Sequence, residues 1–598
     1  MRFRLGAISI LAFHRFQGAR LDRDAPRAAA KAAQGLLAAF LLVLAAAPAA
    51  VGAPLSPNDP TQALPKGGPP GPSAPLNLPN TRPPVAPQDL TVRLVLRGVE
   101  FDGASAVPEA RLRPAWEPLV GKPVTLGDLR AIGHRAEAIY EQAGYPFVAV
   151  VLKVQEVKDG IVHFDVVEGR ISDLTVLGSN VAARRQATAA LQPIVNVSPL
   201  SLGEVESTYQ LAKQVPGLAI SGTLRRGSQP GGMDLVVDAQ RPTDFRTYIN
   251  VNNLYADPVG PWGVLAGVDY FGSTEYGDQT SVQVYTSVPV GRQVLVRGSY
   301  ALRLNSYGTT VTLSGLWGTA DPKGSLTPLA IAEDVATVRG EVSQPLWERP
   351  DGSLLVDLGL EGSNQTTKVF RTIGLSDDRL RVLDFTLSGE KRGRLGRLSF
   401  SGEIRQGLNF GDASYPGEAS LGRIGGDPQA SIFRVAAEYE SPTVSYVRLL
   451  ARLDSQYSDR PLTTPDQYSI GNLTIGRGYQ PGAALGDKAL AGSTEVRFGP
   501  FALTKSLQIE PFGFYDVVSL WDNGIGTFRQ HTIDSAGGGL RLQLGDKAHM
   551  DLIYAVPLAP ALGLGDSTPT PSVLVNLTVG LNDAFAAIHN RLVSGTAK

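Results

Sequence analysis

The chain has 598 residues, too many for one ordinary globular core, so two or more domains are expected. Its 55 Lys and Arg residues nearly balance 56 Asp and Glu residues, and the net charge of -1 indicates no polyanionic partner such as a nucleic acid. The absence of cysteine excludes disulfide bonds and thiolate metal sites.

The first predicted element is a cleavable secretory signal over residues 1–53. An apolar run, "QGLLAAFLLVLAAAPAAVGA", follows several basic residues and ends in small residues suited to cleavage. A membrane anchor is the alternative, but the strongly apolar core is only about a dozen residues, whereas a spanning helix needs roughly 20. Residues 54–89 then predict an extended linker, because proline at this density prevents helices and strand ladders.

Two segments of similar composition follow the linker, at residues 90–169 and 170–241. The first reads as strand, helix, strand, strand, with helical apolar spacing from Leu129 to Tyr140 and a turn signal at Asp159-Gly160. The second repeats this order in "ISDLTVLGSN", "LSLGEVESTYQLAKQVPG" and "AISGTLRRGSQPGGMDLVVDAQ". We predict tandem α+β domains whose strand edges bind an extended partner by adding a strand.

Residues 242–598 predict a transmembrane antiparallel β-barrel. In "SLLVDLGLEGS", for example, Val356 and Leu358 share one face, opposite Asp357 and Gly359. A closed barrel suits lipid because it pairs every backbone amide, which lipid cannot do. A soluble sandwich or propeller also alternates, but about 340 residues without a helical break exceed one sandwich. With a secretory signal, this pattern predicts the outer membrane of a Gram-negative bacterium.

Motifs for catalysis and cofactor binding are missing from the sequence. The six histidines are scattered and none lies in an HExxH pattern. The pair Gly121-Lys122 is followed by proline, which excludes a phosphate-binding P-loop, and no Gly-x-Ser-x-Gly elbow occurs. We therefore expect no catalytic residue, no metal and no cofactor, and we predict that the chain is not an enzyme.

The segment "LTIGRGYQPGAALGDKALAGSTEVRFGP" interrupts the strand pattern with glycines around Arg477 and Tyr479. In the later strand "LQIEPFGFYD", Phe514 and Asp516 share a polar face that must point to the lumen, because an aspartate in lipid is costly. A guanidinium can hold a carboxylate with two parallel hydrogen bonds. Two readings stay open: a mobile surface loop with an incidental arginine, or a loop folded into a solvated lumen, where such a pair adds about 1 kcal/mol.

The order of signal, proline-rich linker, two repeats and barrel resembles the outer-membrane transporters of two-partner secretion, the TpsB type of the Omp85 superfamily, to which ShlB, FhaC and HecB belong. The resemblance implies that the repeats are POTRA domains and that the barrel has about 16 strands. Arg477, Gly478 and Tyr479 match the family's Arg-Gly-Tyr/Phe motif on the sixth extracellular loop. Phe514 and Asp516 match its aromatic-x-Asp motif, so the resemblance implies that Asp516 pairs with the loop arginine.

The resemblance also implies a function in protein transport, of the kind called haemolysin secretion and activation or type V secretion. A large secreted partner protein would dock on the POTRA domains in the periplasm and cross the barrel lumen. Outer-membrane lipid and the barrel-assembly machinery are the other expected partners, and nucleic acid is not expected. The alternatives are an Omp85-type factor that inserts outer-membrane proteins, a passive porin-like channel, and a soluble secreted β-protein.

Overall fold

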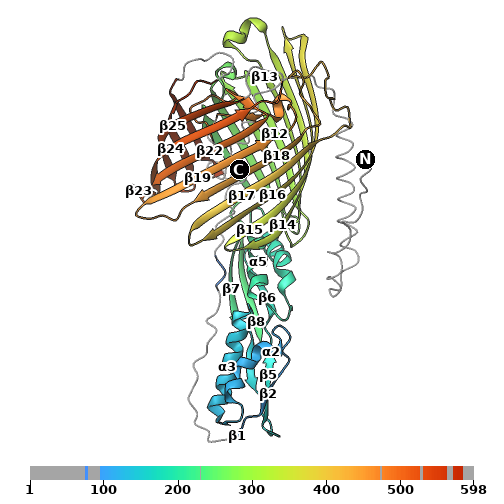
Figure 1. Cartoon of the computed structure of the whole chain (residues 1–598), viewed down its shortest axis with the longest axis vertical. Helices are drawn as coiled ribbons and strands as arrows, with labels where there is room; N and C mark the ends of the chain where they lie inside the picture. The colour runs from blue at the N-terminus through green and yellow to red at the C-terminus, as the bar shows by residue number, and fades with distance from the viewer. Residues whose placement is uncertain are drawn as a thin grey trace, which may run out of the picture. The chain divides into compact units, whose positions relative to one another are not determined.

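The chain forms two small mixed sheets with helices, followed by a closed barrel, in the computed structural model (Figure 1). No helix within the described part of the chain is long and apolar enough to cross a membrane. The predicted signal and most of the predicted linker lie outside the described residues, which are 75–77, 94–228, 231–471, 475–524, 530–561 and 570–582.

The main sheet of the first repeat has three strands, β2, β4 and β5, and helix α3 lies between β2 and β4 in sequence, as predicted. Its elements are β1 (Leu94–Val95), β2 (Gly98–Asp102), α2 (Glu109–Leu112), η2 (Arg113–Ala115), η3 (Glu117–Leu119), β3 (Pro123–Val124), α3 (Leu126–Gln142), β4 (Ala149–Leu152) and β5 (Ile161–Val167). The sheet order is β2-β5-β4, with β2 parallel and β4 antiparallel to β5. Asp159 and Gly160 have φ of 55° and 74° just before β5, the left-handed turn that the Asp-Gly pair predicts.

The second repeat has the same topology. It consists of β6 (Arg170–Leu177), α4 (Val181–Leu191), η4 (Gln192–Ile194), α5 (Leu202–Lys213), β7 (Ala219–Arg226) and β8 (Gly232–Gln240). The sheet order is β6-β8-β7, again with the first strand parallel and the second antiparallel to the third. Helix α4 escaped sequence analysis because its buried face is built mainly from alanine, which gives a weak apolar signal. Helix α5 begins with a capping box between Ser201 and Glu204.

Asn77, inside the predicted linker, forms an isolated parallel β-bridge with the edge strand β7. The backbone N–H of Asn77 donates to the oxygen of Gly222 at 3.0 Å, and Leu224 N–H donates to the oxygen of Asn77 at 3.0 Å. Leu76 packs on the apolar core of the second repeat. This single bridge was not expected in the predicted linker; it forms where "LNL" interrupts the prolines and leaves a backbone donor free.

The barrel closes on itself through antiparallel pairing of its first and last strands. Asn576 pairs with Asn252 and Gly580 with Tyr248. The predicted antiparallel β-barrel with about 16 strands is confirmed. Its strands are β9 (Phe245–Asn252), β10 (Trp262–Phe271), β11 (Asp278–Val288), β12 (Gln293–Arg303), β13 (Thr310–Ala320), β14 (Ala332–Arg349), β15 (Gly352–Val369), β16 (Ile373–Gly393), β17 (Gly396–Gly407), β18 (Ser431–Glu440), β19 (Val447–Tyr457), β22 (Lys488–Phe498), β24 (Leu507–Trp521), β25 (His531–Leu544), β26 (Ala548–Pro557) and β27 (Ser572–Gly580).

The barrel carries apolar side chains outside and charged side chains inside. Leu358 and Phe385 are 48% and 44% exposed, facing outwards from β15 and β16. On the inner face, Arg339 donates to Asp384 at 2.5 Å and to Glu341 at 2.8 Å. This distribution is the reverse of a soluble core and suits a sheet that faces lipid around a polar lumen.

A partly buried carboxylate, Glu168, holds the end of β5 to the rest of the first repeat. Glu168 accepts hydrogen bonds from the N–H groups of Ser105 and Ala106, each at 2.7 Å, and from the Tyr140 hydroxyl at 3.0 Å. Burial raises the pKa of Glu168, but the hydrogen bonds from Ala106, Ser105 and Tyr140 outweigh it, so the net pKa lies below the usual value.

We predict that Glu168→Gln lowers the free energy of local unfolding of the first repeat by about 1–3 kcal/mol at pH 7. Because the folded pKa is depressed, this stabilisation is complete above about pH 4.3 and is lost as the pH falls through the folded pKa. Hydrogen-exchange protection of the Ser105 and Ala106 amides in the full chain measures it. Glu117→Gln, in a pair with Arg113 that is more than half exposed, is the matched control and should change little.

Candidate functional site

The connection between β19 and β22 is long and folds back into the barrel. It contains a short 3-10 helix, η7 (Thr464–Asp466), and a two-residue pairing of β20 (Tyr468–Ser469) with β21 (Leu485–Gly486). Arg477 stands between these two short strands in sequence and is 1% exposed. The loop thus presents its arginine to the inner wall instead of to the solvent.

Arg477 grips Asp516 on β24 with its side chain and its backbone. Nη2 donates to Oδ1 at 2.7 Å and Nε donates to Oδ2 at 3.0 Å, which is the two-point contact that a guanidinium makes with a carboxylate. The N–H groups of Gly476 and Arg477 each add a bond of 3.1 Å to Oδ2. Asp516 therefore fixes the loop backbone as well as the arginine side chain.

Two further residues of β22 complete this site, which we name the tip clamp: Arg477, Asp516, Glu495, Ser493 and Phe514. Nη1 of Arg477 donates to Glu495 at 2.7 Å, and Nη2 donates to the Ser493 hydroxyl at 3.0 Å. Ser493 itself donates to Asp516 at 2.7 Å. The guanidinium carbon lies 3.6 Å from the centre of the Phe514 ring, a cation–π contact.

Glu495 connects the tip clamp to other lumen charges. Its carboxylate accepts hydrogen bonds from Arg497 and from Arg541, each at 2.6 Å. Arg541 in turn stacks on Phe512, 4.3 Å from the ring centre. Because one carboxylate serves three arginines, a change at the clamp is expected to disturb the charges along β22, β24 and β25.

The glycines and Tyr479 allow the loop to approach the wall closely. Gly476 has φ of 83°, a left-handed conformation that favours glycine, and a side chain at Gly478 would lie 2.8 Å from the backbone nitrogen of Pro557. The Tyr479 hydroxyl lies 2.7 Å from the backbone oxygens of Asp534 and of Ala559. This second anchor spans β25 and the segment after β26.

The structure brings together all five residues named from the sequence, which are Arg477, Gly478, Tyr479, Phe514 and Asp516. The expectation of a solvated ion pair is wrong, because Arg477 is 1% and Asp516 is 0% exposed. Ser493 and Glu495 were missing from the predicted set. The alternation in "STEVRF" could have identified them, because it puts both residues on the lumen face. In the register of the two strands, Ser493 pairs with Asp516 and Glu495 pairs with Phe514.

Potential metal ligands also occur on the first repeat. Glu100, Asp102 and His163 bring ligand atoms within 4.8 Å of one another. The Lys153 ammonium lies 3.4 Å from Asp102 and 3.0 Å from Asp165, so a cation already compensates this acidic group. The group is largely exposed, and we assign it no function.

Two family descriptions match the chain. Residues 94–169 match "POTRA domain, ShlB-type", and residues 262–542 match "Haemolysin secretion/activation protein ShlB/FhaC/HecB". Together they cover more than half of the 598 residues. Both descriptions name ShlB. The first match covers the first repeat, and the second covers most of the barrel.

Individual proteins agree with these matches. The chain is 19% identical over 453 residues to the heme/hemopexin transporter protein HuxB of Haemophilus influenzae, covering 73% of this chain and 79% of that protein. It is 20% identical over 432 residues to the outer membrane transporter CdiB of Dickeya dadantii strain 3937, covering 68% and 73%. The solved structure of CdiB from Escherichia coli superposes with a TM-score of 0.70 at 16% identity, covering 94% of this chain and 100% of that chain. CdiB from Acinetobacter baumannii gives a TM-score of 0.60 at 13% identity, with the same coverage.

We predict that Arg477→Ala and Asp516→Asn release the loop tip. Removing one partner of a buried pair strands the other charge, so each change should lower the free energy of loop opening by about 3–5 kcal/mol. Exchange of the Gly476 and position-477 amides, together with single-channel conductance in planar bilayers, measures the release. The double variant should add little to either single one, because both remove the same contact.

Arg460→Ala is the matched control for this experiment. Arg460 lies in the same loop but is 56% exposed, so its loss should leave tip exchange and conductance unchanged. Equal conductance in wild type, Arg477→Ala and Asp516→Asn would contradict a role for the tip clamp in channel closure.

Proposed function

The chain belongs to the haemolysin secretion/activation family ShlB/FhaC/HecB, whose members are two-partner secretion transporters, and from this premise we propose how it handles its partner. It is an outer-membrane barrel with POTRA domains in the periplasm, and it secretes a partner protein. In our proposal the partner docks on the POTRA repeats as an extended chain and then passes the tip clamp in the barrel lumen. The matches of ShlB type on both the first repeat and the barrel carry this proposal.

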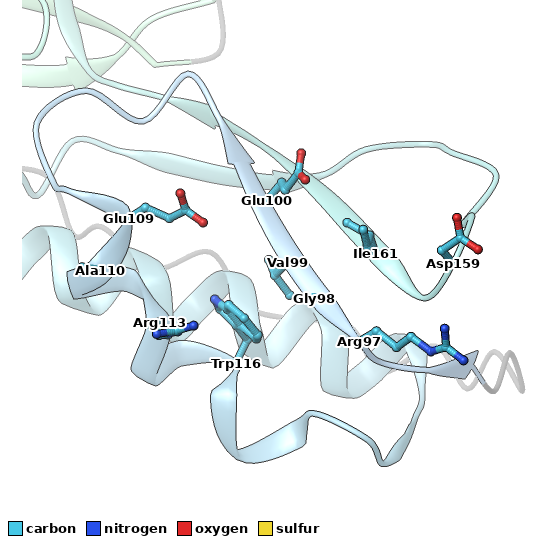
Figure 2. Close-up of a pocket in the computed structure, with 10 residues that line it drawn as sticks. All are labelled: Arg97, Gly98, Val99, Glu100, Glu109, Ala110, Arg113, Trp116, Asp159 and Ile161. Carbon is cyan, nitrogen blue, oxygen red and sulfur yellow. The ribbon is translucent and has the colours of Figure 1, made fainter.

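Strand β2 supports docking by strand addition. It forms one edge of the first sheet, and a cavity of about 500 Å³ lies beside it, between β2 and α2 (Figure 2). Among the described residues, the buried indole N–H of Trp116 in this cavity has no acceptor. An extended segment pairing with β2 would satisfy the backbone N–H and C=O groups of this free strand edge, next to the cavity. Strand β7 is less open, because Asn77 already forms a bridge with it.

The lumen supports passage of an unfolded polypeptide. An extended chain in transit exposes backbone amides that need hydrogen-bonding partners. The inner wall offers paired groups such as Arg405 with Glu361 at 3.3 Å and Arg452 with Glu438 at 2.7 Å. Pairing leaves the wall polar without a strong excess of one charge, so it does not bind one segment too tightly to release it.

The tip clamp supports a closed resting state in this proposal. Its loop stands in the lumen and must move for a polypeptide to pass. A porin-like channel has no need of POTRA repeats, and a factor that inserts outer-membrane proteins is disfavoured because the matched families are of the secretion type.

We predict that a photoreactive residue at Glu100 cross-links to the partner during secretion. Glu100 lies on β2 and lines the cavity (Figure 2). Thr188, which is exposed on helix α4 and is not part of a strand, is the matched control and should cross-link little. The probe is a large secreted exoprotein, co-expressed with this chain in a Gram-negative host.

The same experiment tests secretion itself. The exoprotein should reach the medium only when this chain is present and should accumulate in the periplasm otherwise. Secretion that does not depend on the chain would overturn the proposed function. Secretion without cross-linking at Glu100 would overturn only the docking edge.

A further inference from the structure

A second arginine between glycines occurs in another connection of the barrel. Arg423 stands in "LGRIGG", in residues 408–430 between β17 and β18, just as Arg477 stands in "IGRGYQPG". Counting from β9, which follows the second periplasmic repeat, both connections follow odd-numbered strands. They therefore share the extracellular end of the barrel.

Arg423 contacts two other extracellular connections. Its Nη1 donates to Asp487 at 2.5 Å and to the backbone oxygen of Leu462 at 2.7 Å, both in the loop that carries Arg477. Its Nη2 donates to the second oxygen of Asp487 at 3.0 Å and also to Asp522, just after β24. Gly524 makes room for this guanidinium, because a side chain there would lie 2.8 Å from Nη2.

Asp487 is the centre of this cluster. It is 0% exposed and stands directly before β22, where the Arg477 loop ends. Besides Arg423, its carboxylate accepts the N–H of Leu462 at 2.9 Å and the N–H of Asn523 at 2.6 Å. Burial raises the pKa of Asp487, but Arg423 and these N–H groups lower it below its usual value. The carboxylate is therefore ionised at neutral pH and fully engaged.

We propose that Arg423 and Asp487 are positioning residues. They hold the ends of the loop that carries Arg477, next to β19 and β22, at the extracellular mouth of the barrel. We name this site, with Leu462 and Asp522, the base clamp. It ties the connections after β17, β19 and β24 together, whereas the tip clamp ties the loop tip to the wall. The loop is thus fixed at two separate points, and both must yield before the lumen is open from end to end. This inference rests on the proposed function for its role in transport, but its geometry does not.

The test compares full-length Arg423→Ala with a matched control in outer-membrane vesicles. The control is Arg371→Ala, which removes an exposed arginine that joins two extracellular connections by a 2.7 Å pair with Asp321. In Arg423→Ala, the Leu462 and Asn523 amides, which donate to Asp487, should exchange about ten to a hundred times faster than in wild type. In Arg371→Ala they should exchange at the wild-type rate.

Channel recordings distinguish loss of the contacts at the extracellular mouth from disruption of the whole loop. Openings of Arg423→Ala in planar bilayers should be several times more frequent, while Gly476, held by the tip clamp, keeps its slow exchange. Arg423→Lys should lie between wild type and Arg423→Ala, because one ammonium can pair with Asp487 without also reaching Leu462 and Asp522. If Arg423→Ala fails to assemble, Arg423→Lys and Asp522→Asn give the same comparison.

The base clamp would be overturned if Arg423→Ala and Arg371→Ala showed the same exchange rates at the Leu462 and Asn523 amides and the same frequency of channel openings. Faster exchange at Gly476 to the same degree as at Leu462 would also overturn it, because the loop would then be one rigid unit. Failure of the transport proposal looks different. In that case the exchange and channel effects of Arg423→Ala appear as expected, but the exoprotein is not secreted even by wild type.

Discussion

The requirement that every barrel strand pair on both sides shapes the rest of the molecule. Pairing of β27 with β9 closes the barrel, so the described strands pair with neighbours on both sides instead of presenting a free edge to lipid. With the backbone satisfied, side chains alternate between lipid and lumen. The lumen therefore collects the polar residues that lipid excludes, including Asp384, Glu495 and Asp516, all almost fully buried. Buried carboxylates need cations, and arginines from neighbouring strands and from one loop provide them.

A buried ion pair of this kind adds little to the stability of the barrel, but it resists separation of its two partners. Forming the pair of Arg477 with Asp516 gains little net free energy, because both ions lose their hydration. Breaking it is costly as long as the separated charges stay dry. A polypeptide or water that enters the lumen supplies new hydrogen-bonding partners, and the cost then falls. Under the proposed function, the loop is therefore held firmly in the resting barrel and released when the lumen fills.

The architecture and the central residues of the tip clamp could be predicted from the sequence, but the full set of residues in the clamp could not. Strand alternation and the Asp-Gly turn are local signals, so the barrel and both repeats could be predicted from them. The pairing of Arg477 with Asp516 came from a family resemblance, since no local pattern tells how far a loop folds inward. Ser493 joins the site only through register with Asp516, which depends on how β22 and β24 align. Strand pairing by residues 75–77 was missed because it depends on β7, far away in the sequence.

The two clamps differ in exposure, and under the proposed function this difference sets the order in which they release. Arg477 and Asp516 are 1% and 0% exposed, so solvent at the mouth does not reach the tip clamp. At the base clamp, Arg423 is 16% and Asp522 35% exposed, so extracellular solvent reaches it. A chain arriving from the periplasm meets the tip before the base. Under the proposed function, the tip responds to what enters the lumen, and the base holds the mouth closed until the loop has lost its inner anchor.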